Sequence, residues 1–510
     1  MEIELNEQFN EALKIIESGK NLILTGRAGT GKSTFLKYLC ENTKKQYVLL
    51  APTGVSAVNI GGQTIHSFFK FKPNVTIDEA IEIANRNIEN EIYRKIDLMI
   101  IDEISMVRAD LLDCMDIFLK IVRKNKKPFG GVQILFVGDL YQLPPVVDKE
   151  EKEIFTKIYE TPYFFSSNVM KNFSPEFIEF EKIYRQKERE FIDILNAIRN
   201  DKITEEMIKK LNERYVPDFN EEENQDYIYL TSRNEEANEI NRKNLEKLEG
   251  QAVVYTANVK GTFDPEYFPT DLKLKLKKSA RVMLLNNDNF GRWINGSLGW
   301  IKNLHSEYIE VILDNGKEIT VEPYQWEINE LYFDKKEEKI KKRTIGTFSQ
   351  IPVQLAWAIT IHKSQGKTFE KVIIDIGKGI FAPGQLYVAL SRCRTIEGII
   401  LKKPIEKKHI YIDKRVVKFL TKYQYKKAEE DISLDEKILL IKRAIEEKKK
   451  IQITYLKSND EKTHRVIYPQ KIYETELNGI PYIALEGYCY LKNKKRVFNL
   501  KKILKAKLIE

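Results

Sequence analysis

The sequence predicts an α/β protein with two parallel-sheet domains, to which smaller β modules are attached. Short apolar runs alternate with helical patterns through about the first 200 residues. Runs such as LMIID and QILFVGD are continuous in Val, Ile and Leu, which is typical of parallel strands buried on both faces. The alternation resumes near Tyr227 and again from Pro352, so we expect a second α/β domain there.

Three segments interrupt or extend this pattern. Short alternating strands surround Asn315-Gly316, a hairpin signal that predicts a small β-barrel inserted in the second domain. A polar stretch interrupts the first domain, and a helix with several short strands follows the second. The expected divisions are a first domain over 1–185 with an insertion at about 70–95, a second domain over 186–422 with its barrel at about 297–345, a linker over 423–431 and a C-terminal domain over 432–510.

The composition is that of a globular protein: 42% of the residues are hydrophobic and 31% are charged. No apolar run approaches the ~18 residues that a membrane span requires, and the N-terminus is acidic and amphipathic, unlike a secretory signal. The four cysteines and five histidines are scattered, with no C-x-x-C pair and no local zinc spacing. We therefore expect a soluble, cytoplasmic protein with no membrane partner, whose metal is the one that a nucleotide brings.

The formal net charge of +9 is unevenly distributed along the chain. Residues 431–510 hold 18 basic and 11 acidic side chains, a net +7, so the first 430 residues carry only +2. This imbalance indicates a polyanionic partner for the C-terminal domain. A solvated, lysine-rich surface is the alternative interpretation.

Residues 26–33 read GRAGTGKS, which matches the phosphate-binding loop G-x-x-x-x-G-K-[ST]. Its glycines let backbone N–H groups approach phosphates, Lys32 would reach the β- and γ-phosphates, and Ser33 would hold Mg²⁺. A structural Gly-rich turn is the alternative, but the loop follows the apolar run NLILT and opens a helical pattern. The residues expected to bind ATP here are Gly26, Gly29, Thr30, Gly31, Lys32, Ser33 and Thr34.

Further polar residues follow the next apolar strands. In IIDEIS, Asp102 would bind Mg²⁺ while Glu103 positions or deprotonates the attacking water. In VGDLYQLPP, Gln142 could sense the γ-phosphate, whereas Asp139 fits a turn residue. An arginine donated across a cleft stabilises charge in phosphoryl transfer, and a lone arginine is otherwise a surface residue. The two candidates are Arg185 in KIYRQ and Arg392 in YVALSRCR.

The order of these motifs resembles superfamily 1 helicases and, more narrowly, Pif-type (petite integration frequency) DNA helicases over about residues 1–410. The motifs are GRAGTGKS, APTGVSA, IIDEIS, VGDLYQLPP, YRQ, ITIHKSQGKT and YVALSR. The resemblance implies two RecA-like domains with ATP between them, a wedge in the 70–95 insertion, an SH3-like barrel and 5′→3′ movement. One departure is Val55-Ser56, which stands where an alanine-rich run with a basic residue is common.

The resemblance also implies particular binding residues. Gln8 would bond adenine, and Gly366 would lie at the nucleotide. The residues that would hold single-stranded DNA are Thr53, Gly54, Thr64, His66, Ser67, Phe68, Thr360, His362, Lys363 and Ser364. Independently of the family, Phe68, Phe69 and Phe71 lie beside lysines, the mixture of stacking faces and cations that single strands require. The alternative is that these aromatic rings pack the insertion against the sheet.

The C-terminal segments IQITY, RVIYPQKI, GIPYIALEGYCY and KKRVFNLKKI resemble a WYL domain, a small β module found in bacterial regulators. Its eponymous triplet is replaced here by Pro481-Tyr482-Ile483. The resemblance places the basic site at Arg496, which would bind single-stranded nucleic acid or a nucleotide. A purely structural appendage is the alternative.

Together these features predict a bacterial ATP-dependent 5′→3′ DNA helicase of replication or repair that uses ATP and Mg²⁺. Its partners would be single-stranded DNA and duplex junctions, and it would be a monomer in solution. An ATP-gated single-strand binding switch, or a translocase without unwinding, is the alternative function. A regulator built around the WYL module is a third, but it leaves about four-fifths of the chain unexplained.

Overall fold

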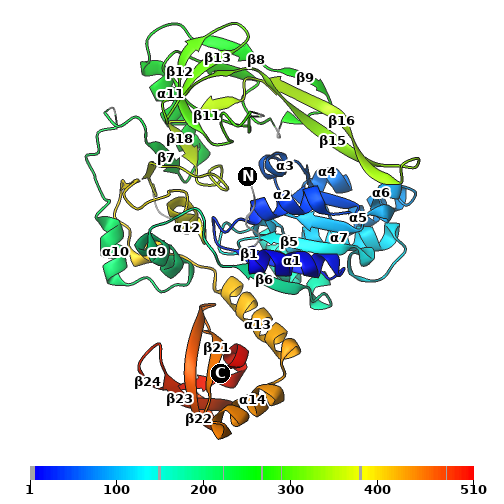
Figure 1. Cartoon of the computed structure of the whole chain (residues 1–510). Helices are drawn as coiled ribbons and strands as arrows, with labels where there is room; N and C mark the ends of the chain where they lie inside the picture. The colour runs from blue at the N-terminus through cyan, green and yellow to red at the C-terminus, as the bar shows by residue number, and fades with distance from the viewer. Residues whose placement is uncertain are drawn as a thin grey trace. The chain divides into compact units, whose positions relative to one another are not determined.

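The computed structural model describes residues 6–147, 151–221, 223–265, 268–288, 290–377, 382–477 and 479–509. The chain forms two compact units (Figure 1). One comprises Met1–Arg199 with Ile203–Tyr411, and the other comprises Asn200–Lys202 with Ile412–Glu510. Among the helices of the described ranges, none is long and apolar enough to cross a membrane.

The first domain is a six-stranded parallel sheet in the order β3-β2-β4-β5-β1-β6. Its central strands are buried along their whole length, as their continuous apolar sequences predict. The strands are β1 (Leu22–Gly26), β2 (Tyr47–Ala51), β3 (Gln63–Thr64), β4 (Leu98–Ile101), β5 (Gln133–Gly138) and β6 (Glu176–Phe180). The α-helices connected to them include α1 (Glu7–Glu17), α2 (Lys32–Asn42), α3 (Gly54–Ile60), α7 (Ala109–Val122) and α8 (Lys152–Ile158).

The segment expected as an insertion in this domain is helical. Thr76 and Glu79 form a reciprocal capping box that starts the longest of its helices. The helices are α4 (Ile65–Phe69), which leads into the segment, then α5 (Ile77–Arg86) and α6 (Glu91–Lys95).

The second domain is a smaller parallel sheet in the order β18-β7-β19-β20. Its core contains side chains from the sheet, from helices before it in the chain and from the helix between its last two strands. The strands are β7 (Ile228–Thr231), β18 (Ala358–Thr360), β19 (Val372–Ile374) and β20 (Ile399–Leu401). The helices are α9 (Arg189–Arg199), α10 (Glu205–Asn212), α11 (Asn234–Lys247) and α12 (Gln385–Leu390).

The β insertion in this domain is wider than the expected 297–345, because strands well before it in the sequence join its sheets. β9 (Asn258–Gly261) pairs with β16 (Lys339–Gln350), and β11 (Arg281–Leu284) pairs with both β12 (Leu298–Leu304) and β17 (Val353–Leu355). The other strands are β8 (Val253–Thr256), β10 (Lys273–Leu276), β13 (Ile309–Leu313), β14 (Glu318–Val321) and β15 (Tyr324–Asp334).

Strands β15 and β16 form a long hairpin that reaches across to the first domain, above α3 and α4 in Figure 1. At its far end, the ammonium group of Lys95 in α6 lies 5.2 Å from the ring centroid of Phe333. Nearby, the backbone N–H of Ile340 donates to the side-chain oxygen of Gln46 at 2.8 Å. The two domains and the hairpin are thus parts of one compact unit.

The predicted linker over 423–431 is wrong, since these residues are the second half of helix α13 (Lys414–Asp431). Gln424 and Ala428 are buried, and the Gln424 amide donates to Asp460 in the C-terminal unit at 2.6 Å. The charged residues that suggested a linker cover the other face of this helix. The unit also contains α14 (Leu434–Glu446) and an antiparallel sheet in the order β24-β23-β22-β21-β25. Its strands are β21 (Lys450–Leu456), β22 (Lys462–Leu477), β23 (Ile480–Cys489), β24 (Lys494–Asn499) and β25 (Ile503–Ile509).

Candidate active site

The sheet order of the first domain places its signature residues side by side. The phosphate-binding loop follows β1, Asp102-Glu103 follows β4 and Gln142 lies four residues after β5. These strands are neighbours in the order β4-β5-β1, and parallel strands present their carboxyl ends at one edge. Three motifs far apart in the sequence therefore meet at one site.

The phosphate-binding loop has the backbone geometry that phosphate binding needs. Gly29 and Gly31 have φ values of 79° and 87°, in the left-handed region that favours glycine. A Cβ at Gly29 would overlap the Cβ of Arg185, so these two segments of the chain approach too closely for a side chain there. The ammonium group of Lys32 donates to the carbonyls of Gly26 at 2.7 Å and Arg27 at 3.0 Å. The loop therefore holds Lys32 across its mouth.

The charge of Lys32 depends on nearby carboxylates. Burial lowers the pKa of Lys32, and the charges of Asp139, Glu103 and Asp102 act in the opposite direction. A cation in a partly desolvated site attracts polyphosphate strongly, because little water screens it. This is the electrostatic setting expected of a nucleoside triphosphate site.

Asp102 and Glu103 are two adjacent carboxylates that directly follow β4. Glu103 has a φ of 51°, and its backbone N–H donates to the Asp102 carboxylate at 2.9 Å. Burial raises the pKa of both carboxyls, and together with the charge of Asp102 it brings the pKa of Glu103 to about 7. A carboxyl with a pKa near neutrality can take a proton from water at physiological pH. Glu103 is thus suited to act as a general base.

Gln142 lies in a chain of hydrogen bonds that joins the two domains. Its side-chain N–H donates to Asp139 at 3.3 Å, and the hydroxyl of Tyr387, from α12 of the second domain, donates to the same carboxylate at 3.2 Å. The backbone N–H of Ala28, in the phosphate-binding loop, donates to the Tyr387 hydroxyl at 3.2 Å. Sequence reasoning did not identify Tyr387. The only available signal was its place four residues before Ser391-Arg392, in YVALSR.

A second residue that sequence reasoning missed is Gln365. Its side-chain nitrogen donates to Glu103 at 3.1 Å and to the side-chain oxygen of Gln142 at 2.9 Å. Gln365 lies in ITIHKSQGKT, between the predicted DNA-binding residue Ser364 and the predicted nucleotide-binding residue Gly366.

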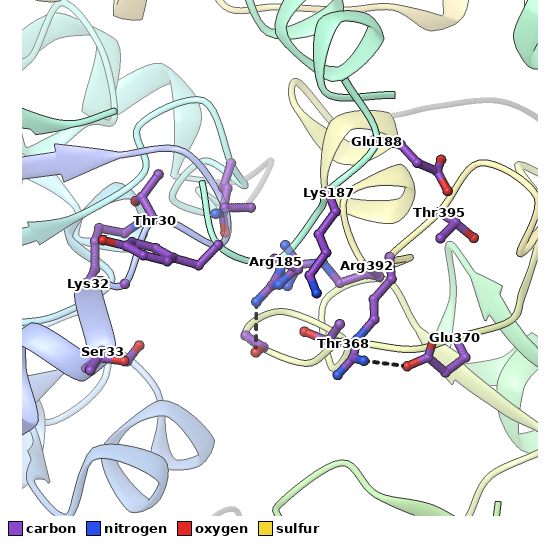
Figure 2. A pocket seen from close by; sticks show the side chains of 18 of the residues that line it. Thr30, Lys32, Ser33, Arg185, Lys187, Glu188, Thr368, Glu370, Arg392 and Thr395 are labelled. Carbon is purple, nitrogen blue, oxygen red and sulfur yellow. Dashed lines mark hydrogen bonds and ion pairs between the residues drawn. The ribbon is translucent and has the colours of Figure 1, made fainter. Parts of the chain in front are cut away.

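The two predicted arginines come to the same pocket from different elements. Arg185 donates to the carbonyls of Ser391 and Gly366, each at 3.3 Å. Arg392 is 1% exposed and donates to the Val388 carbonyl at 2.9 Å. Burial lowers the pKa of Arg392 to about 9, and the charge of Arg185 acts in the same direction. In Figure 2 Arg185 lies between the phosphate-binding loop and the second domain, and Arg392 lies beside it on the second domain.

The pocket between these groups has a volume of about 830 Å³. A pocket of this size is typical for a cofactor-sized ligand. The predicted residues that line it are Gly29, Thr30, Gly31, Lys32, Ser33, Thr34, Glu103, Gln142, Arg185, Gly366 and Arg392. The lining does not include Gly26, Asp102 or Gln8.

The structure places Gln8 against backbone groups. Its side-chain nitrogen donates to the Glu179 carbonyl at 2.8 Å, and its side-chain oxygen accepts from the Glu181 N–H at 3.0 Å. Gln8 therefore ties α1 to the end of β6, and its adenine role stays a prediction. The aromatic residues that line the pocket are Phe9 and Tyr184, and the Tyr184 N–H donates to the Gly29 carbonyl at 2.8 Å. Sequence reasoning missed Tyr184, which directly precedes Arg185.

The predicted DNA-binding threonines all follow strands and cap the turns after them. Thr53 follows β2 and accepts from the Ser56 N–H at 3.2 Å, and Thr64 ends β3 and accepts from the Ser67 N–H at 3.1 Å. In the second domain, Thr360 ends β18 and accepts from the Lys363 N–H at 3.2 Å. The segments expected to bind DNA therefore lie at the carboxyl ends of the strands in each sheet.

Exposure differs among the remaining residues of these segments. Ser67 and Lys363 are exposed, His66 and His362 are half-buried, and Ser364 is buried with its hydroxyl donating to the Ile361 carbonyl at 2.7 Å. Burial lowers the pKa of both histidines. Neutral histidines can bond phosphate only as donors through one ring nitrogen. Gly54, at the start of α3, is half-buried.

The sequence predicts that Phe68 stacks on DNA bases, whereas the structure buries its ring. Phe68 is 5% exposed, and its ring packs edge-on against Phe69 and Tyr93 with centroids 5.0 and 5.2 Å away. Phe69 and Phe71 are buried in the same cluster. Burial of these apolar rings stabilises the insertion against the sheet, which is the alternative that the sequence left open.

In the C-terminal unit, Arg496 is exposed on β24 opposite Gly487 of β23. Its neighbours Lys494 and Lys495 are also exposed, so β24 presents a run of cations. A second arginine, Arg465, is only 7% exposed, and its guanidinium lies 5.5 Å from the ring centroid of Phe498. Sequence reasoning missed Arg465 because nothing local marks it.

Comparison with known proteins identifies both parts of the chain. A family model described as "PIF1-like helicase" matches residues 4–209, and a WYL domain model matches residues 436–508. The "ATP-dependent DNA helicase Pif1" of Bdellovibrio bacteriovorus is 31% identical over 431 residues, which cover 83% of this chain and 93% of that protein. These matches confirm both resemblances predicted from the motifs.

Two solved structures extend the comparison. The crystal structure of Bacteroides sp Pif1 in complex with ADP-AlF4 is 39% identical, with a TM-score of 0.77, and the match covers 83% of this chain and 98% of that one. Bacteroides Pif1 bound to ssDNA, also 39% identical with the same coverage, matches with a TM-score of 0.59. The predicted α/β fold is thereby confirmed.

Proposed function

The chain belongs to the PIF1-like helicase family, and we propose that it is an ATP-dependent DNA helicase that moves 5′→3′ on single-stranded DNA and separates duplex strands. The observation that carries this proposal is the pocket at the meeting of two parallel-sheet domains. The first contributes Lys32 and Glu103, and the second contributes Gly366 and Arg392. ATP binding and hydrolysis in such a pocket would close and open the cleft between the two domains. A motor requires a domain movement of this kind.

The side chains of the pocket divide the work of hydrolysis. Lys32 binds the β- and γ-phosphates of ATP, and Glu103 takes a proton from water as that water attacks the γ-phosphorus. The bond from the γ-phosphorus to the bridging oxygen breaks, so that ADP and phosphate leave. Arg185 and Arg392 stabilise the charge on the transferring group, and Gln142 orients the water.

Ser33 and Asp102 would hold Mg²⁺. Both offer oxygen ligands, a hydroxyl exposed in the pocket and a carboxylate 9% exposed beside it, which fits the preference of this ion. When bound, Mg²⁺ neutralises phosphate charge.

The DNA strand would contact the segments after β2, β3 and β18. These segments come from both domains. Closing and opening of the cleft therefore changes the distance between the DNA contacts of the first domain and those of the second. Single-stranded DNA then advances by alternating contacts. The 5′→3′ direction is what the resemblance to the family implies, and we infer that the wedge at a duplex junction lies in helices α5 and α6.

The alternative of an ATP-gated binding switch is less well supported. A switch needs no efficient hydrolysis, whereas Glu103, Arg185 and Arg392 all line the pocket. These three residues are the ones that an enzyme needs for repeated rounds of ATP hydrolysis. We place it in replication or repair in a bacterial cytoplasm, acting on single-stranded DNA and duplex junctions as a monomer.

The WYL-type unit would supply an accessory contact for single-stranded nucleic acid along β24. Cations there are exposed, and Tyr488 and Tyr490 of the neighbouring segment offer aromatic faces. In the full chain, substitution of Lys494, Lys495 and Arg496 by alanine should weaken binding of an oligothymidylate and reduce its salt dependence. Unchanged affinity across salt would remove this role.

The deciding experiment for the main proposal compares matched duplexes with either a 5′ or a 3′ single-stranded tail. Unwinding of only the 5′-tailed duplex, dependent on ATP, would establish the motor and its direction. Hydrolysis stimulated by DNA without unwinding of either duplex would support the translocase alternative.

A further inference from the structure

Gln365 connects the proposed DNA-binding segment of the second domain, Thr360–Ser364, to two proposed hydrolytic residues of the first domain, Glu103 and Gln142. It follows Thr360–Ser364 in a series of tight turns after β18. The Ser364 N–H donates to the Thr360 carbonyl at 3.0 Å, and the Gln365 N–H donates to the His362 carbonyl at 3.1 Å. Because these backbone hydrogen bonds link residues only three or four positions apart, we expect residues 360–365 to move together. A strand pressing on Lys363, which is exposed, would therefore shift Gln365 as well.

The side chain of Gln365 crosses the cleft and contacts two residues at once. Its nitrogen lies 3.1 Å from a carboxylate oxygen of Glu103 and 2.9 Å from the side-chain oxygen of Gln142. A primary amide has two N–H donors, and both are used here.

The same contacts orient Gln142. Its nitrogen donates to Asp139 at 3.3 Å, so its oxygen must face the donor from Gln365. The amide of Gln142 is thus held from both ends, and its orientation depends on a residue of the other domain. The position of Gln365 therefore affects both the candidate base and the candidate phosphate sensor.

We propose that Gln365 is a positioning residue that transmits DNA occupancy of the Thr360–Ser364 segment to hydrolysis, by setting the orientations of Glu103 and Gln142 together. This inference rests on the proposed helicase function. It explains physically how a strand could stimulate hydrolysis: the turn that touches DNA carries the amide that arranges the hydrolytic groups.

The test measures ATP hydrolysis by the full-length Gln365→Leu variant, which keeps the approximate volume and removes both donors. We expect kcat at saturating oligothymidylate to fall about tenfold or more, since small misplacements of reacting groups have effects of this size. The KM for ATP and the Kd for the oligothymidylate should stay within about twofold of wild type. The ratio of the rate with DNA to the rate without DNA should fall in parallel with kcat.

The matched control is Gln325→Leu. Gln325 also donates to a carboxylate, that of Glu327 at 3.1 Å, but it is exposed on β15. This variant should resemble wild type in every measurement, and thermal unfolding of both variants checks that the fold is kept. Gln365→Glu, which places an acceptor beside Glu103, should lose kcat as severely as Gln365→Leu.

Two results would overturn the inference. One is a Gln365→Leu variant with wild-type kcat and wild-type stimulation by DNA. The other is a loss confined to the Kd for DNA, which would make Gln365 a DNA-binding residue only. A wild-type chain without any ATPase activity would instead overturn the proposed function, and this is seen before any variant is compared.

Discussion

The hydroxyl of Tyr387, in the second domain, donates a hydrogen bond to the carboxylate of Asp139, in the first, at 3.2 Å. The same hydroxyl accepts the backbone N–H of Ala28 in the phosphate-binding loop at 3.2 Å. One buried side chain thereby connects the nucleotide loop, the segment after β5 and helix α12, which ends two residues before Arg392. Removal of this hydroxyl is a direct test of whether the connection matters.

Tyr387→Phe keeps the ring and removes both hydrogen bonds. A buried hydrogen bond contributes about 1 kcal/mol, or about a fivefold change in an equilibrium. We expect the KM for ATP to rise about fivefold because the Ala28 N–H loses its acceptor. Steady-state ATPase kinetics measure this. A Phe variant with unchanged KM and kcat would mean that the contact has no part in nucleotide binding.

Lys32→Ala should reduce ATP hydrolysis by about 100-fold or more, because it removes the ammonium group that the phosphate-binding loop holds for the β- and γ-phosphates. Lys37→Ala, on the exposed face of the following helix, is a suitable control. Persistent ATPase activity in the Lys32 variant would refute the assignment of the phosphate-binding loop.

The pH dependence of hydrolysis should report Glu103, whose pKa burial raises to about 7. The carboxylate, not the acid, accepts the proton, so activity is lost as the pH falls. We expect log kcat/KM to decline below about pH 7 with a slope near one. Glu103→Gln should bind ATP but turn it over very slowly at every pH. A wild-type profile flat down to pH 5 would contradict the role of base.

Phe68→Ala should destabilise the protein without specifically weakening DNA binding. Truncation of a buried phenylalanine costs about 3–5 kcal/mol, so the unfolding temperature should fall clearly. Phe290→Ala provides the control, because Phe290 is 85% exposed and its removal should leave thermal stability unchanged. A Phe68→Ala variant that kept its thermal stability but lost affinity for DNA would instead support the stacking role of Phe68.

Lys363→Ala should weaken binding of single-stranded DNA of any sequence. An exposed lysine that contacts phosphate releases a counterion, so the slope of log affinity against log salt should fall by about one. Fluorescence anisotropy with a labelled oligothymidylate at several salt concentrations measures both quantities. An unchanged slope would place Lys363 away from the strand.

Particular residues show where sequence reasoning succeeded and where it failed. The phosphate-binding loop and Asp102-Glu103 were predictable because each is a contiguous stretch whose function depends on local backbone geometry. The strands of residues 253–284 were missed because their partners lie up to about 90 residues away. The linker prediction failed because helix α13 shows a charged face to solvent and buries only scattered residues such as Gln424.

The sequence alone determined the chemistry: a phosphate-binding loop, a carboxylate pair, two arginines and two strand-tracking motifs in a recognisable order. Tertiary structure decided which groups act on one another. It brought Gln365 and Tyr387 to residues more than 200 positions away and buried Phe68 among other rings. The physical reason is that motifs encode local backbone shape, whereas contacts across a cleft depend on sheet order and domain packing, which no short stretch of sequence contains.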